Sequence, residues 1–214
     1  MTKSIIASLI FILSSAAYAW DNNEIDQAWR TENIDQLTKL AKLDGFDALY
    51  SHYRLALLAQ EKGDKKLAKN SLEIIFDALE DNYQSADQAA LYYNALGLSI
   101  ALKPWTAAFT LKKANKAIEY SDLAAPNHAP SLVAKAVGLI NRPAFAGGDK
   151  AQALIYLDEA LETYRLTEAW GYEDAWLWKV KVLAALDQPD QAQATLKALL
   201  TQFPDFKAAE RLAL

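Results

Sequence analysis

The feature that most constrains the fold of this sequence is a succession of short segments whose apolar residues recur at helical spacing. In residues 67–80, Leu72, Ile75 and Leu79 fall on one helical face. Turn residues separate the segments, as at Gly63-Asp64 and across residues 126–130. No segment alternates with period two, so the expected fold class is all-α. The predicted helices cover residues 33–42, 46–62, 67–80, 85–102, 105–120, 131–140, 150–166, 173–186, 190–203 and 206–214.

The last two long segments carry a repeat spacing. Seven of their residues follow one another at intervals of 4, 3, 9, 4, 3 and 5. This pattern resembles the tetratricopeptide repeat, in which small residues let two antiparallel helices approach and large residues fill the space between pairs. The resemblance implies tandem antiparallel helix pairs that form a short right-handed α-solenoid. The residues are Trp176, Val180, Leu183, Ala192, Leu196, Leu199 and Pro204; Val180 and Leu199 stand where the family usually has smaller residues.

Looser copies of the pattern begin at His52, Tyr93 and Ala134. The resemblance, which is to exported bacterial repeat proteins, therefore covers residues 46–206. Residues 20–45 are predicted to form an atypical pair of N-terminal capping helices, because terminal repeats usually have a distinct outer face. Residues 207–214 are predicted to be a helical tail.

The first residues have the organisation of a signal peptide. Lys3 precedes an apolar run over residues 5–13, and Ala17-Tyr18-Ala19 forms a small-residue cleavage site. We expect cleavage before Trp20, which removes residues 1–19; an uncleaved anchor or a buried first helix is the alternative. The product would be exported, and periplasmic if the source is Gram-negative. The chain has no Cys, so its stability cannot come from disulfides.

The charge balance limits the classes of partner. The net charge is −5, and no cluster of Lys and Arg is longer than a pair. Nucleic acids and anionic membranes attract basic patches, so this balance disfavours both. We also expect no integral membrane segment after cleavage, and the sequence leaves the oligomeric state open.

The sequence contains no recognisable catalytic constellation. His52 and His128 have no acidic or Cys partners at metal-ligand spacing. Gly147-Gly148 lacks the second half of a phosphate-binding loop, and we interpret it as a turn with Asp149 as the cap of the next helix. The prediction is a protein that is not an enzyme and has no cofactor or metal.

The resemblance also implies a place for a partner, because in this family the first helix of each pair lines a concave groove. Lys, Arg and Asn side chains there would suit an acidic peptide or a free C-terminal carboxylate. An ordinary mixed surface is the alternative. The predicted partner-binding residues of this concave groove are Tyr50, Tyr53, Asn94, Lys135, Arg142, Lys181 and Trp178.

Two functions remain open at this point. The first is a non-enzymatic exported scaffold that binds a protein or peptide, with a role in envelope assembly or transport. The second is a small-ligand carrier or an accessory protein of a transporter. The second follows from the loop of residues 141–149, which is similar to a loop in the periplasmic T-component of TRAP-type transporters.

Overall fold

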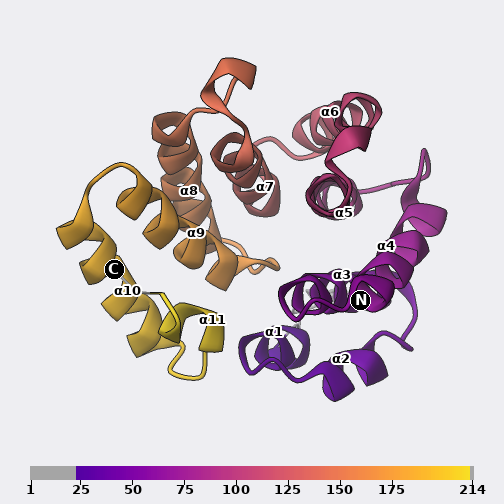
Figure 1. Ribbon diagram of the computed structural model, residues 1–214, viewed down its shortest axis with the longest axis horizontal. Coiled ribbons are helices and arrows are strands. Elements are labelled where there is room, and N and C mark those ends of the chain that lie inside the picture. Colours follow the sequence, from indigo (N-terminus) through magenta and orange to yellow (C-terminus); the bar gives the residue numbers. More distant parts are fainter. Residues whose placement is uncertain (1–22, 213–214) are drawn as a thin grey trace, which may run out of the picture.

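The computed structural model describes residues 23–212, and within them every regular element is helical (Figure 1). Eleven α-helices and two 3₁₀ turns follow one another through these residues without a strand. The elements are α1 (Asn23–Arg30), α2 (Ile34–Leu40), α3 (Gly45–Glu61), α4 (Lys65–Leu79), α5 (Ala86–Leu102), η1 (Pro104–Thr106), α6 (Ala107–Ala124), α7 (Ala129–Asn141), η2 (Ala144–Ala146), α8 (Lys150–Tyr164), α9 (Tyr172–Ala185), α10 (Pro189–Gln202) and α11 (Lys207–Glu210).

The helices pack in pairs, as the sequence predicts. α3 packs on α4, α5 on α6, α7 on α8 and α9 on α10. The first helices of successive pairs also pack on one another, from α1 through α3, α5 and α7 to α9. Figure 1 shows these first helices on the inside of a curved array and their partners on the outside. The protein is therefore a helical solenoid with an inner and an outer layer.

Side-chain caps fix where several helices begin. Asp64 Oδ1 accepts a hydrogen bond from the backbone N–H of Leu67 at 2.9 Å, and Asp149 Oδ1 accepts one from Gln152 at 2.9 Å. The Asp149 cap confirms that the Gly147-Gly148 turn leads into α8. The sequence context of Pro130 predicts a turn, but the residue lies in the first turn of α7. Proline is tolerated there because backbone N–H groups in the first turn make no hydrogen bond within the helix.

Alanine at the start of the second helices lets the pairs approach closely. Ala68, Ala153 and Ala192 are each the fourth residue of α4, α8 and α10, and each is fully buried. A larger side chain at these positions would force the first helix away, because interiors are packed without spare volume. This confirms the role that the repeat pattern assigns to Ala192.

The array curls until its two ends meet. Trp29 in α1 packs edge-to-face on Phe206, with 6.4 Å between ring centroids. Lys207 Nζ donates a hydrogen bond to the carbonyl of Thr31 at 2.7 Å, and Arg211 pairs with Glu32. Figure 1 accordingly shows α11 beside α1. The solenoid is closed into a ring.

The described part of the chain, residues 23–212, has no helix that is long and apolar enough to cross a membrane. The predicted signal peptide, residues 1–19, lies outside the described residues.

Candidate functional site

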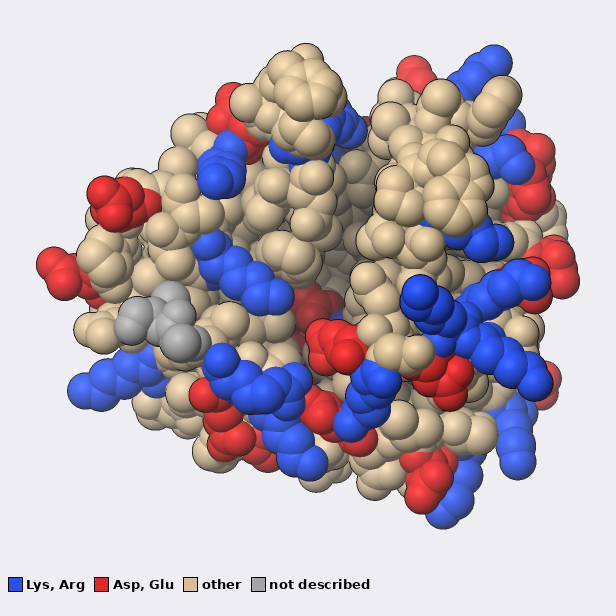
Figure 2. All heavy atoms as spheres, in the orientation of Figure 1, with Lys and Arg blue, Asp and Glu red and all other residues tan. Residues whose placement is uncertain are grey.

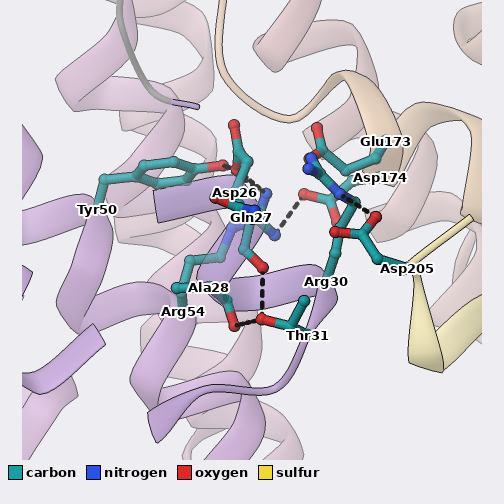
Figure 3. A network of polar contacts seen from close by, with 10 residues as sticks. All are labelled: Asp26, Gln27, Ala28, Arg30, Thr31, Tyr50, Arg54, Glu173, Asp174 and Asp205. Atoms are coloured by element: carbon teal, nitrogen blue, oxygen red, sulfur yellow. Dashed lines mark hydrogen bonds and ion pairs between the residues drawn. The ribbon is translucent and has the colours of Figure 1, made fainter. Parts of the chain in front are cut away.

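The inner layer of the ring holds a buried network of charged side chains (Figure 3). Arg54 in the middle of α3 is fully buried, and its guanidinium forms ion pairs with Asp26 of α1 at 2.9 Å and with Asp174 of α9 at 2.7 Å. Tyr50, one helical turn before Arg54, donates its hydroxyl proton to Asp26 at 2.5 Å. One arginine thus joins three inner helices from opposite ends of the chain.

A second arginine completes the closure. Arg30, at the end of α1, pairs with Glu173 of α9 at 2.8 Å and with Asp205, after α10, at 3.0 Å. The Arg30 guanidinium also lies over the ring of Phe203, 4.9 Å from its centroid. Figure 3 shows Arg30 between the carboxylates of α9 and the segment after α10. The ring is therefore closed by charged contacts as well as apolar ones.

Four carboxyl groups share these two arginines, so the network has an excess of negative charge. Burial and the neighbouring charges of Asp26 and Asp174 raise the pKa of Glu173 to about 8. Burial also raises the pKa of Asp174, against the opposing charge of Arg54. The raised pKa favours the protonated form of Glu173, which can still accept the hydrogen bond from Arg30 and reduces the repulsion among the four groups.

A loop between α8 and α9, residues 165–171, crosses the inner face at one rim. Trp170 in this loop is buried against the rings of Phe46 and Tyr50, at centroid distances of 6.0 and 5.2 Å. Its indole N–H donates to Asp87 at the start of α5 at 2.8 Å. Asp87 also lies 3.0 Å from the Nε2 atom of His128. The loop therefore occupies the groove at the N-terminal ends of the inner helices.

The opposite rim is open. Figure 2 shows a hollow between the part of the surface formed by η1, α5 and α6 and the part formed by α7 and η2. At its base, α5 and α7 approach so closely that a methyl group on Gly138 would lie 2.3 Å from the Tyr93 hydroxyl. Gly97 of α5, by contrast, has open space where a side chain would project. Partner access is thus available at the C-terminal ends of the inner helices.

Comparison with known proteins identifies the repeat. The tetratricopeptide repeat model matches residues 174–205, which span α9 and α10. Residues 174–205 are thus similar to a tetratricopeptide repeat. The match falls on the helix pair whose spacing resembles the family most closely in sequence, and the earlier pairs share its packing in the structure.

A similar solved structure is the HusA haemophore from Porphyromonas gingivalis. The two folds agree with a TM-score of 0.55 at 16% sequence identity, over 77% of this chain and 91% of that chain. This likeness supports the tetratricopeptide-like helical fold. No curated protein matches the sequence.

The tetratricopeptide register places the predicted partner-binding residues on first helices, but only some of them lie together. Tyr50 is fully buried in the charge network, and Tyr53 is half-buried close to Asp174. Lys181 is half-buried with its ammonium 4.4 Å from the centroid of the Trp178 ring. Burial lowers the pKa of Lys181, while the nearby charges of Glu61 and Asp174 oppose this shift. These residues belong to the α3–α9 side of the inner layer.

Of the other predicted residues, Asn94 lies on α5, Lys135 lies on α7, and Arg142 directly follows α7. Asn94 and Arg142 are both half-buried, and the charge of Arg142 acts on the Tyr93 hydroxyl, whose pKa burial raises. Lys135 pairs with Asp122 of α6 at 2.6 Å and lies over the Tyr156 ring of α8. The Lys135 ammonium therefore contacts the outer-layer helices α6 and α8 and does not lie beside Lys181 and Trp178.

Sequence reasoning missed the residues that close the ring. Asp26, Arg30 and Glu173 are buried although they are charged, and nothing in helical periodicity marks a charged residue as buried. The available signal is the position of Arg54 on α3. It lies one turn after Tyr50, and Leu55 and Leu58 of the same helix are also buried. Trp170 lies between two predicted helices, so its burial gave no periodic signal either.

The two histidines have different surroundings, and the Nδ1 atom of His52 is buried without a hydrogen-bond partner among the described residues. The Nδ1 atom of His128 lies 2.8 Å from Ser131 Oγ at the start of α7, and burial lowers the pKa of His52. Across residues 23–212 no group of three His, Cys, Asp or Glu side chains is arranged to hold a metal ion. Asp158 of α8 pairs with Lys179 of α9 at 2.6 Å.

Proposed function

We propose that this protein is a non-enzymatic exported scaffold that binds a protein or peptide at the hollow between α5 and α7. The observation that carries the proposal is the contrast between the two rims. Trp170 fills the groove at one rim, whereas the rim at the ends of α5 and α7 is open (Figure 2). Tetratricopeptide repeats generally act by presenting such an inner surface to another chain, although fold alone does not specify the partner.

The charge at this rim favours an acidic partner. Arg142 directly follows α7 beside the hollow, and it forms no ion pair with a carboxylate among the described residues. Arginine binds carboxylates in a planar two-bond geometry, which suits an acidic side chain or a free C-terminus. Asn94 on the facing helix supplies an amide that both donates and accepts hydrogen bonds.

The test is a capture experiment from an extract of the source organism, with a matched charge variant. Arg142→Glu should lose the partner, because the change replaces attraction by repulsion at the hollow. Arg165→Glu is the control, since Arg165 is exposed and pairs only with Glu162 on its own helix. A partner retained equally by both variants would show that binding occurs elsewhere.

A small-ligand carrier is the second candidate, because the similar structure is that of a haemophore. In this alternative the hollow between α5 and α7 would hold a small apolar ligand, as pockets between helices commonly do. Native mass spectrometry of the purified protein and titration with haemin would test it. A mass excess, or a haemin absorbance change that Gly97→Trp abolishes, would favour the carrier over the scaffold.

Export and a role at the cell envelope remain part of the proposal. They rest on the order of charge, apolar run and cleavage site in residues 1–19. N-terminal sequencing of the mature product should begin at Trp20. Retention of Met1 would contradict export by cleavage and would leave the binding proposal untouched.

A further inference from the structure

Three aromatic side chains project from the open rim without packing on the protein. Trp105 in η1 is 77% exposed, Phe109 in the first turn of α6 is 82% exposed, and Phe145 in η2 is 95% exposed. Exposed apolar side chains in such a group usually mark an interaction surface. We call these three residues together with Lys103 and Lys112 the aromatic edge.

The aromatic edge is held out by ordered backbone. In η1, the backbone N–H of Thr106 donates to the carbonyl of Lys103 at 3.0 Å, and its hydroxyl donates to the same carbonyl at 2.8 Å. In η2, Gly147 adopts a left-handed backbone with φ of 87°, and a methyl group on Gly148 would lie 1.8 Å from the carbonyl oxygen of Arg142. Both turns therefore present their aromatic residues in fixed positions.

The charge around the aromatic edge is opposite to that of the whole protein. Residues 88–148 contain six Lys and Arg and two Asp and Glu, a balance of +4, which leaves −9 for the rest of the chain of net charge −5. Three of the six cations form ion pairs: Lys135 with Asp122, and Lys113 and Lys116 with Glu80 and Asp81 of the segment after α4. The other acidic residue, Glu119, lies ten residues after Phe109 on α6, or about 15 Å along the helix at 1.5 Å per residue. Lys103 and Lys112 are therefore the exposed cations beside Trp105 and Phe109, and neither forms an ion pair among the described residues.

We propose that the aromatic edge docks the protein on an anionic lipid surface. Trp and Phe side chains insert at the boundary between headgroups and acyl chains, and adjacent Lys and Arg attract anionic headgroups. The net charge of the whole chain does not reveal this patch, because the excess of Lys and Arg appears only when residues 88–148 are counted alone.

Geometry favours a lipid surface over the other occupants of an apolar patch. Phe145 is too exposed to line the hollow, so a small ligand held between α5 and α7 would not contact most of its ring. The two aromatic turns stand on either side of the hollow in Figure 2, so a flat folded surface resting on both turns would leave the hollow unfilled, unlike a partner segment that enters it. Separate projections inserted into a fluid surface need no such central contact.

The test is flotation with vesicles of phosphatidylcholine containing phosphatidylglycerol, against vesicles of phosphatidylcholine alone. The protein should bind the anionic vesicles, and Trp105→Ala/Phe109→Ala/Phe145→Ala should weaken partition by about tenfold or more, because three aromatic anchors are removed. The matched control is Leu123→Ala/Leu166→Ala, since these leucines are 80% and 86% exposed but lie outside the aromatic edge. The control should bind as the unmodified protein does.

A second pair of variants tests the charge. Lys103→Glu/Lys112→Glu should abolish the preference for phosphatidylglycerol, whereas Lys39→Glu/Lys42→Glu, on and after α2, should retain it. Melting curves should show that all variants are folded. No binding of the unmodified protein to anionic vesicles, or equal losses in the test and control variants, would overturn the proposal. Capture of a protein partner that the aromatic variant loses, with no vesicle binding by either form, would overturn it as well.

This inference is independent of the proposed scaffold function. Partner capture at the hollow depends on Arg142 and Asn94, whereas vesicle binding depends on the three aromatic residues. If both proposals hold, the triple aromatic variant keeps its partner and loses the vesicles. Failure of one experiment therefore leaves the result of the other interpretable.

Discussion

The last helix pair and the closure between the two ends of the chain are held together by different forces. α9 and α10 pack through Val180, Leu183 and Leu199, which are all buried and apolar. The ends of the ring meet through Arg30 and Arg54, which draw carboxyl groups from segments more than 100 residues away in sequence. Apolar packing loses stability gradually as atoms are removed. A buried ion pair fails abruptly, because removal of one partner leaves the other charged and desolvated.

Removal of Arg54 should have the largest effect. Arg54→Met leaves Asp26 and Asp174 buried without their cation, so the free energy of unfolding should fall by about 3–5 kcal/mol. The control is Lys62→Met, because Lys62 pairs with Glu32 while nearly half exposed, and such pairs contribute about 1 kcal/mol or less. Urea denaturation measures both. Equal losses would mean that the closure is not held by buried charge.

The apolar side of the comparison is tested at Ala192. Ala192→Glu places a charged side chain where α10 meets α9, and the cost should be about 3 kcal/mol. Gln193→Glu, one residue further along, is exposed and should leave the melting temperature unchanged. A melting curve of Ala192→Glu that matches the unmodified protein would show that the repeat register is wrong.

The contrast also explains how much of this molecule could be predicted from its sequence. Helix number and approximate bounds followed from apolar spacing and caps, and Ala192, Leu183 and Leu199 are buried as the repeat pattern requires. Ends of helices were less certain: the helix predicted from residue 105 begins instead with η1 and continues as α6 to Ala124. Local spacing predicts local pairing, since each pair buries its own apolar faces.

Ring closure could not be predicted, because it depends on the sum of small rotations between pairs. The rotation that brings Asp174 to Arg54 arises across four helix pairs, and no local pattern records it. The candidate groove stays a prediction: helix pairing follows from local spacing, but no contact among the described residues shows that the first helices bind a partner. Local spacing also does not predict which side chains meet within the groove. Lys135 pairs with Asp122 of α6, whereas Lys181 lies over the Trp178 ring.

A change at a backbone contact of the open rim should lower the free energy of unfolding by less than Ala192→Glu does and by more than loss of an exposed ion pair does. Gly148→Ala would place a methyl group against the carbonyl of Arg142, so the η2 turn must shift, at a cost of about 1–3 kcal/mol. Gly97→Ala is the matched control, because its added methyl meets nothing within 4 Å and α5 should gain about 0.5–1 kcal/mol. Thermal unfolding should move in opposite directions for the two variants. Destabilisation by both would show that the α5 wall of the hollow is less open than the structure has it.

The smallest effect on the free energy of unfolding is expected at Glu173, because its raised pKa favours the neutral form of the side chain. Its pKa is raised from about 4.5 in the unfolded chain to about 8, so the folded protein binds the proton more tightly. The stability that this proton confers is fully present below pH 4.5, falls as the pH rises, and is lost above about 8.

Glu173→Gln supplies a neutral group of similar volume, so at pH 7 it should change the free energy of unfolding by less than about 1 kcal/mol. It should also remove most of the decline in stability between pH 4.5 and 8, measured by urea denaturation across that range. A loss at pH 7 as large as that of Arg54→Met would mean that Glu173 is ionised in the folded protein, and that Arg30 depends on its charge as Asp26 and Asp174 depend on that of Arg54.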